Sequence, residues 1–201
     1  VHNVTRSAGV FFIKTLYSIL LCVLCLLTNT LFPFVPIQIT LIDLVIEGYP
    51  SFFLSFLPDS RPVRTKFLPE AIRRAAPNAL AIGICFLFYL VLHAMGIFGL
   101  SGEQTQANTL LFLLIGTVGL LGVFKMCLPF TKVKAFFAAT SAIGFYFAIA
   151  LCLWLQQHLL HLDILHLAVP TGTTLLFFGL FAVVAILTAS ILSRTLFKQK
   201  R

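Results

Sequence analysis

Two acidic residues stand four positions apart inside an apolar stretch that is long enough to cross a lipid bilayer. They are Asp43 and Glu47, within residues 36–57. Helical residues at this spacing lie on one face, one above the other, and at 1.5 Å per residue Glu47 would lie about 16 Å into the stretch. A lone carboxylate at that depth costs roughly 2.5–3.5 kcal/mol. We therefore expect a cation, a proton or a basic partner to neutralise the pair. Hard cations such as Ca²⁺ or Mg²⁺ suit carboxylate oxygens.

The same stretch is interrupted directly after Glu47. Pro50 has no N–H to donate to the carbonyl of Ile46, four residues earlier, and Gly48 tolerates unusual backbone conformations. We predict a hinge at Gly48 and Pro50, with the freed backbone carbonyl oxygen of Ile46 as an additional metal ligand. Broken helices at ion sites in the middle of the membrane are a recurring device in transporters. The alternative is a proline kink beside a carboxylate that is paired with a cation such as Lys14.

The preceding apolar stretch offers polar side chains that could face the two carboxylates. Thr15 and Ser18 are three residues apart and carry hydroxyl oxygens, so we include both in the predicted metal site. Lys14 has two possible roles there: a built-in counter-ion for the carboxylates, or a side chain that extends outward to the membrane surface. We predict the second role, because a lysine can bury its aliphatic stem and keep its ammonium group in water.

Two further groups of residues have spacings that invite a metal. One is a histidine cluster with a neighbouring acid, made of His158, His161, His166 and Asp163. The other is a cysteine pair, Cys22 and Cys25. The histidines could hold a metal, but a wet, amphipathic loop is the favoured interpretation and their role stays open. The cysteines have no other soft ligand near them in the sequence, and cysteine is ordinary apolar filler in membrane helices.

The composition excludes a soluble globular protein. Of the 201 residues, 60% are hydrophobic and only 10% are charged, whereas a soluble domain is about a quarter charged. The formal net charge is +8, but the basic residues lie between hydrophobic blocks. They therefore indicate membrane topology and not a nucleic-acid partner. The expected surroundings are a lipid bilayer.

The apolar residues form blocks of roughly 20 residues, the length of a membrane-spanning helix. We predict an all-α fold: a polytopic membrane helical bundle with six transmembrane helices that forms one domain over residues 1–201. The predicted helices cover residues 8–31, 36–57, 79–100, 108–130, 135–155 and 171–193. Residues 58–78 are expected to be the only sizeable cytoplasmic loop.

The positions of the basic residues predict how the bundle is oriented. All 14 Lys and Arg fall at or near the two termini or in and around alternate connections, and residues 29–35, 101–107 and 156–170 contain none. Basic residues are concentrated on the cytoplasmic side of membrane proteins. We therefore predict that both termini are cytoplasmic. Because the chain begins with Val1 and runs almost directly into a membrane helix, we also expect it to be a fragment of a longer protein.

Residues 36–50 resemble the sixth membrane helix of P-type cation-transporting ATPases. In that family the helix has Pro-x-Gln, then an Asn or Asp four residues before an acidic residue, and then Gly-x-Pro. The matching residues in this sequence are Pro36, Gln38, Asp43, Glu47, Gly48 and Pro50. Residues 3–7, followed by residues 11–18, are similar to the entry to the fifth helix in the bacterial cation-transporting ATPase E group. This part of the resemblance implies a bacterial cell membrane. The resemblance covers residues 1–77. Beyond them only the number of helices and the cytoplasmic C-terminus match.

The resemblance implies that the chain is the C-terminal half of a pump's transport domain, with Asp43 and Glu47 at the ion ligands of the sixth helix. The animal calcium pumps have an Asn and a Glu where Thr15 and Ser18 align, and a Thr in place of Ile46. Fewer ligands imply one ion per cycle, with Ca²⁺ or Mg²⁺ as the transported cation.

The resemblance also separates this chain from the chemistry of ATP. The family's phosphorylated aspartate and nucleotide domain are absent from residues 1–201, so ATP and its Mg²⁺ would act only through the missing N-terminal half of the pump. The alternative function is a stand-alone secondary cation transporter or channel that uses the same intramembrane carboxylates.

Overall fold

The computed structural model describes residues 2–56, 67–95, 104–160 and 165–195, and all of its regular structure is helical. In chain order the elements are α1 (His2–Thr28), α2 (Pro36–Ile42), the π-helix η1 (Asp43–Gly48), α3 (Tyr49–Ser55), α4 (Phe67–Ala94), α5 (Gln104–Met126), α6 (Lys132–Leu155), the π-helix η2 (Gln156–Leu160) and α7 (Gly172–Thr195). The predicted all-α fold is confirmed, with no strand in the described ranges.

Five helices in the described ranges are long and apolar enough to cross a membrane: stretches within α1, α4, α5, α6 continued into η2, and α7. A sixth path is built from three shorter pieces, α2, η1 and α3, which follow one another without a gap from residue 36 to residue 55. At 1.5 Å per residue, these 20 residues extend about 30 Å, the thickness of the hydrocarbon core.

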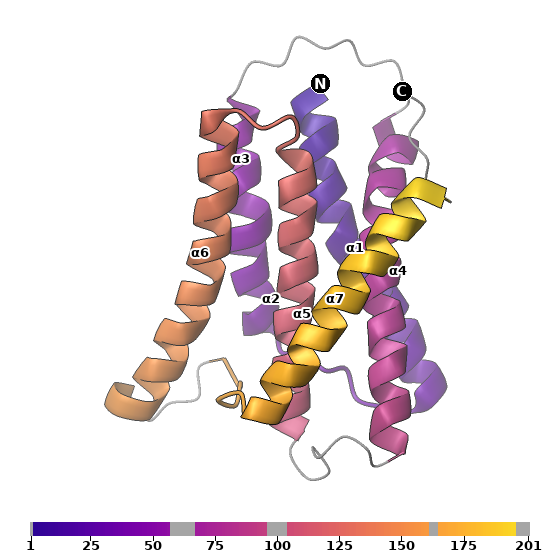
Figure 1. The fold of residues 1–201 in the computed structure, drawn as a ribbon, viewed down its shortest axis with the longest axis vertical. Helices are drawn as coiled ribbons and strands as arrows, with labels where there is room; N and C mark the ends of the chain where they lie inside the picture. Colours follow the sequence, from indigo (N-terminus) through magenta and orange to yellow (C-terminus); the bar gives the residue numbers. More distant parts are fainter. Residues whose placement is uncertain (1, 57–66, 96–103, 161–164, 196–201) are drawn as a thin grey trace.

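Helix α5 forms the centre of the bundle (Figure 1). Consecutive side chains around this helix are buried, as at Leu111, Phe112, Leu113 and Leu114, because α1, α4, α6, α7 and η1 all contact it. Figure 1 shows α7 crossing obliquely over α5 and α4, while α6 stands beside α3. The pair η1 and α3 is therefore held between α1, α5 and α6.

Three glycines on one strip of α5 allow this close approach. A Cβ at Gly116 would collide with the ring of Phe145 on α6, and one at Gly122 would lie 2.6 Å from Cδ1 of Ile13 on α1. At Gly119 the added atom would lie 3.1 Å from Cγ2 of Ile46 in η1. Small residues let membrane helices pack backbone to backbone, and here they bring η1 against the central helix.

Helix α4 begins earlier than predicted. Residues 67–78 were expected to be loop, but they form the first part of α4, and Pro77 lies inside the helix. Pro69 is tolerated because it lies in the first turn, where its missing N–H has no helical partner. Arg74 Nε lies 2.9 Å from Glu70 Oε1 across one turn, which adds local support. The predicted end of this helix, residues 96–100, lies outside the described residues.

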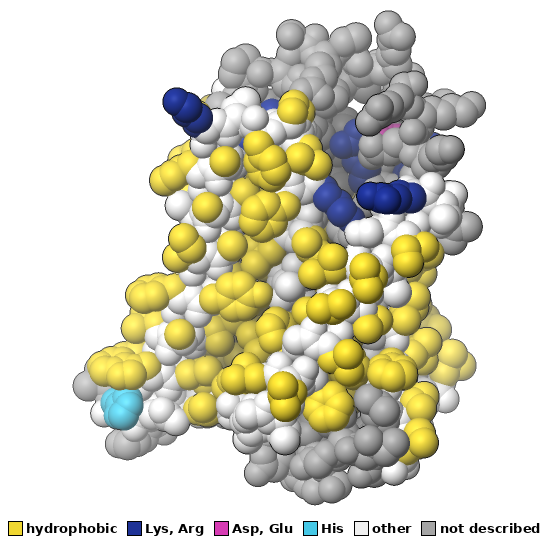
Figure 2. Space-filling model, in the orientation of Figure 1, with side chains coloured by type: hydrophobic (Ala, Val, Ile, Leu, Met, Phe, Trp, Pro, Cys, Tyr) yellow, Lys and Arg dark blue, Asp and Glu magenta, His cyan; other side chains and the backbone are white. Residues whose placement is uncertain are grey.

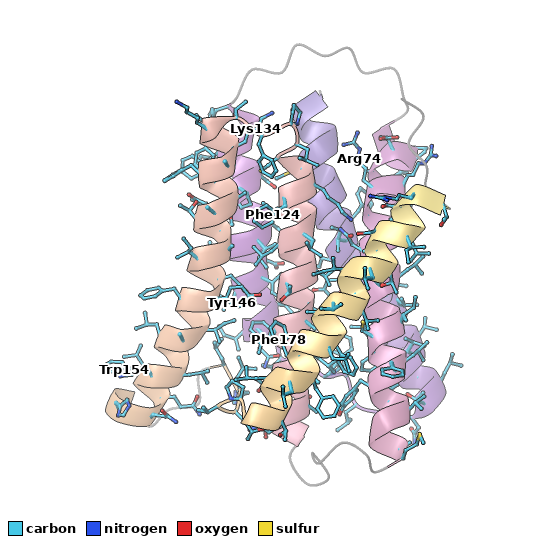
Figure 3. The ribbon with its side chains drawn as sticks, in the orientation of Figure 1. Arg74, Phe124, Lys134, Tyr146, Trp154 and Phe178 are labelled. Atoms are coloured by element: carbon cyan, nitrogen blue, oxygen red, sulfur yellow. The ribbon has the colours of Figure 1, made fainter. Side chains whose placement is uncertain are left out.

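The surface has an apolar middle and one basic end. Figure 2 shows hydrophobic side chains over the length of the visible face, with the described Lys and Arg gathered at the end where the chain starts. Lys134 and Arg74 lie toward that end in Figure 3, and Trp154 lies toward the opposite one. The cytoplasmic location of the basic end stays a prediction from the positive-inside pattern.

Candidate cation site

The segment with the two acidic residues is a π-helix, wider than an α-helix. It runs over Asp43–Gly48, and the N–H of Tyr49 donates to the carbonyl of Leu44, five residues earlier. Pro50 has no N–H, so the carbonyl of Ile46 receives no α-helical hydrogen bond from it. Single π-turns within helices are frequent at functional sites. The irregular backbone thus begins at Asp43, several residues before the predicted hinge at Gly48 and Pro50.

Asp43 is paired with a lysine from the neighbouring helix. The ammonium nitrogen of Lys14 on α1 lies 2.6 Å from both carboxylate oxygens of Asp43, and the two side chains are 32% and 38% exposed. The prediction that Lys14 extends to the membrane surface is wrong. In an apolar region each charge alone carries a large desolvation penalty, and pairing offsets part of it for both. The counter-ion role, which the sequence left open, holds for this one carboxylate.

Glu47, four residues after Asp43, is not paired with a basic side chain among the described residues. It is 3% exposed, and among the described residues its carboxylate makes no hydrogen bond or ion pair. The hydroxyl of Tyr17, a residue 2% exposed, also has no hydrogen-bond partner there, and neither has the buried Oγ of Ser51. Helix α1, which carries Tyr17, contacts η1 and α3, which carry Glu47 and Ser51. We call Tyr17, Glu47 and Ser51 the Glu47 cluster.

Thr15 does not join this cluster. Thr15 is exposed and its hydroxyl donates back to the carbonyl of Phe11 at 3.4 Å, while Ser18 is half-buried. The face of α1 that meets the bundle carries Ile13, Tyr17 and Leu21. The helical spacing of these large side chains is the signal that would have pointed to Tyr17 from the sequence.

Several known proteins have sequences similar to this chain. The chain is 36% identical over 203 residues to the probable cation-transporting ATPase exp7 of Streptococcus pneumoniae, an alignment that covers 94% of the chain and 24% of that protein. It is 30% identical over 176 residues to the calcium-transporting ATPase CtpE of Mycolicibacterium smegmatis, covering 81% of the chain and 22% of the relative. The chain belongs to the P-type cation-transporting ATPases.

The match concerns one part of these ATPases. The chain spans about a quarter of the length of the curated relatives it matches, and it corresponds to a C-terminal membrane part of a P-type ATPase in a bacterial cell membrane. A further CtpE, from Mycobacterium bovis, is 34% identical over 120 residues, which cover 54% of the chain and 15% of that protein. No family profile matches the chain, and no solved structure does.

Hydrogen bonds at both ends hold the carboxylate-bearing segment of this P-type ATPase chain in place. At the start of α2, the buried Gln38 accepts from the N–H of Val35 at 3.2 Å and donates from Nε2 to the carbonyl of Leu165 at 2.8 Å. Just past η1, the hydroxyls of Tyr49 and Thr140 on α6 lie 2.9 Å apart. The π-helix is thus tethered on both sides while its own hydrogen-bond pattern is irregular.

The histidine cluster is not assembled in the described part of this ATPase chain. His158 is exposed and its ring lies 5.4 Å from that of Trp154, centroid to centroid. His166 is exposed as well, and His161 and Asp163 lie outside the described residues. Among the described residues no group of three or more His, Cys, Asp or Glu is close enough to hold a metal.

Proposed function

We propose that this chain forms part of the ion pathway of an ATP-driven cation pump and that the carboxylates of Asp43 and Glu47 supply the charge of its cation site. The observation that carries the proposal is the state of Glu47, which is 3% exposed and has no ion-pair partner among the described residues. A carboxylate that stays charged in such a place needs a positive ion beside it. A site that an ion occupies only during part of a transport cycle meets that need.

The chemistry of the site favours Ca²⁺ as the transported cation. Ca²⁺ accepts six to eight oxygen ligands in flexible geometry, whereas Mg²⁺ requires a near-octahedral shell. The irregular π-turn of Asp43–Gly48 would offer backbone carbonyl oxygens as ligands, including that of Ile46. These oxygens need not form the octahedral shell that Mg²⁺ requires. The half-buried Ser18 would add a neutral hydroxyl ligand, and Thr15 is left out because its hydroxyl donates to the backbone carbonyl of Phe11. Two relatives are named calcium-transporting ATPases, in agreement with this choice.

The proposed cycle couples the site to events outside the chain. ATP and its Mg²⁺ bind in cytoplasmic domains that residues 1–201 do not contain, and phosphorylation there moves the membrane helices. Gly48 and Pro50 then act as the hinge at which η1 changes its hydrogen-bond pattern. A change of this kind would withdraw the Ile46 carbonyl from the ion and open the site to the other side of the membrane.

The test uses the full-length protein, purified and reconstituted into liposomes. ATP-driven uptake of radioactive Ca²⁺ is compared for the wild type, Glu47→Gln and Glu70→Gln. Glu47→Gln should reduce uptake to the level of protein-free liposomes, because the amide keeps the shape but removes the charge. Glu70 is paired with Arg74 within one turn of α4, so its variant should transport normally. Normal uptake by Glu47→Gln, or uptake that needs a proton gradient instead of ATP, would contradict the proposal.

A further inference from the structure

The connection that leads into α7 is packed into the bundle instead of lying over its surface. We call residues 165–171 the strap; they lie beside the start of α7 at the lower end of Figure 1. Leu165 and Leu167 are only 4% and 1% exposed, and His166 between them has a φ of 49°, a left-handed turn of the backbone. A buried connection needs partners for its backbone groups.

Helices α5 and α7 supply such partners. On α5, Thr109 Oγ1 accepts from the N–H of Ala168 at 3.0 Å, and Gln106 Nε2 donates to the carbonyl of Val169 at 2.9 Å. The hydroxyl of Thr174 on α7 donates to Gln106 Oε1 at 2.9 Å. The three polar side chains are at most 5% exposed. Because a buried polar network with its bonds made is rigid, the strap is fixed to α5 and α7.

Gln38 joins α2 to this fixed strap. Its Nε2 donates to the carbonyl of Leu165 at 2.8 Å, and its Oε1 accepts from the N–H of Val35 at 3.2 Å. Both ends of the amide are therefore used at a side chain that is 1% exposed. Breaking the bond to Leu165 would leave a buried carbonyl unpaired, at a cost of about 1–3 kcal/mol. This makes the outer piece of the interrupted helix hard to displace.

The inner piece, α3, is held in a different way. The hydroxyls of Tyr49 and Thr140 on α6 lie 2.9 Å apart, and the rings of Phe53 and Phe137 stack with centroids 5.1 Å apart. Tyr49 is half-buried and Phe53 is 40% exposed. Contacts between exposed or half-buried side chains can shift or re-form at little cost. The two pieces on either side of η1 therefore differ in how firmly they are held.

We propose that Gln38 is a positioning residue of the pump: through the strap it holds α2 to α5 and α7, so that η1 and α3 take up the movement of the interrupted helix during transport. This inference rests on the proposed function, and it adds which piece of the interrupted helix stays in place and which residue keeps it there. Gln38 does not touch the ion. It fixes the end of α2 from which η1 starts, and with it the place from which Asp43 and Glu47 reach the ion.

Pulsed electron paramagnetic resonance on the full-length protein in liposomes, in a cysteine-free background, measures the movement. One spin label at Ile191→Cys on α7 is the reference, and the second is at Ile37→Cys on α2 or Phe52→Cys on α3; all three positions are exposed. Distances are compared with Ca²⁺ bound and after its removal by a chelator in the presence of orthovanadate, a phosphate analogue. The Ile37 distance should stay the same, whereas the Phe52 distance should shift by about 1–2 Å or more.

Two variants test the part played by the strap. Gln38→Leu should broaden the Ile37 distance distribution and make it differ between the two states. The Ca²⁺ concentration for half-maximal phosphorylation should rise on the order of tenfold, because the held arrangement is then only partly populated, while maximal phosphorylation is unchanged. Gln106→Leu loosens the strap from α5 and leaves Gln38 intact, and it should have the same two effects.

Two control variants separate positioning from a general loss of stability. Gln157→Leu removes an exposed glutamine from η2 and should change neither the label distances nor the Ca²⁺ affinity. Gly83→Ala makes a Cβ collide with the side chain of Leu20 on α1 and should lower stability through overpacking. Its Ca²⁺ affinity should nevertheless equal that of the wild type.

The inference is overturned if the wild-type Ile37 distance shifts as much as the Phe52 distance, or if neither shifts. These wild-type distances decide the matter even where a variant does not fold. It is also overturned if Gln38→Leu or Gln106→Leu keeps both the wild-type distance and the wild-type affinity. Normal uptake by Glu47→Gln would instead remove the proposed function. An inactive Glu47→Gln together with a mobile α2 removes only the role of Gln38 and the strap.

Discussion

The side-chain amide of Gln38 donates a 2.8 Å hydrogen bond to the backbone carbonyl of Leu165, 127 residues further along the chain. Both residues are buried, at 1% and 4% exposure. The bond ties the start of α2 to the segment that precedes α7. The carboxylate-bearing segment is thereby fixed at one end to a distant part of the chain.

The first prediction concerns this bond. Gln38→Leu should lower the free energy of unfolding by about 1–3 kcal/mol, because the buried carbonyl of Leu165 loses its donor. Thermal unfolding of the purified full-length protein in detergent measures the loss. Gln157→Leu is the control, since Gln157 is exposed in η2. Equal stability of the two variants would show that the Gln38 bond is not needed.

The second prediction concerns the contact between α5 and α6. Gly116→Ala places a methyl group against the Phe145 ring and should cost about 1–3 kcal/mol of stability through overpacking. Replacing Phe145 by Leu in the same protein should recover part of that loss, because the smaller side chain makes room. Gly179→Ala on α7, where an added Cβ has nothing within 4 Å, should be neutral or stabilising. The same thermal unfolding assay serves, and a Gly116→Ala protein as stable as wild type would refute the close packing.

The third prediction concerns the hinge. Pro50→Ala restores an N–H that can bond the carbonyl of Ile46 and continue the α-helix. We expect ATP-driven Ca²⁺ uptake to fall at least about tenfold while thermal stability is kept or improved. Pro77→Ala tests the alternative that removing any helix proline impairs the pump, since Pro77 lies inside α4. Unchanged uptake in Pro50→Ala would remove the hinge from the mechanism.

The fourth prediction concerns orientation in the membrane. In a cysteine-free background, Lys132→Cys should react with a membrane-impermeant maleimide only after the cells are permeabilised, because the basic end is predicted to be cytoplasmic. Val169→Cys, in the connection before α7, should react in intact cells. Both positions are exposed, so access to the reagent differs only by side. The reverse labelling pattern would invert the predicted topology.

Much of the fold follows from local properties of the sequence. Apolar blocks of membrane length must be helices, because an isolated segment in lipid can satisfy its backbone only within itself. The spacing of Asp43 and Glu47 and the missing N–H of Pro50 likewise act within one helical turn or two. The start of α4 was missed because charged residues and two prolines resemble a loop, whereas the chain tolerates Pro69 in a first turn and Pro77 within the helix.

What the sequence determined by itself is therefore the membrane helices, the carboxylate pair and the interruption beside it. The tertiary structure alone decided that Lys14 binds Asp43, that Tyr17 and not Thr15 is buried inside the bundle, and that Gln38 reaches Leu165. The physical reason is that spacing along a helix decides which side chains share a face. Which face meets which neighbour depends on how the helices pack, and that is set by contacts between residues far apart in the chain.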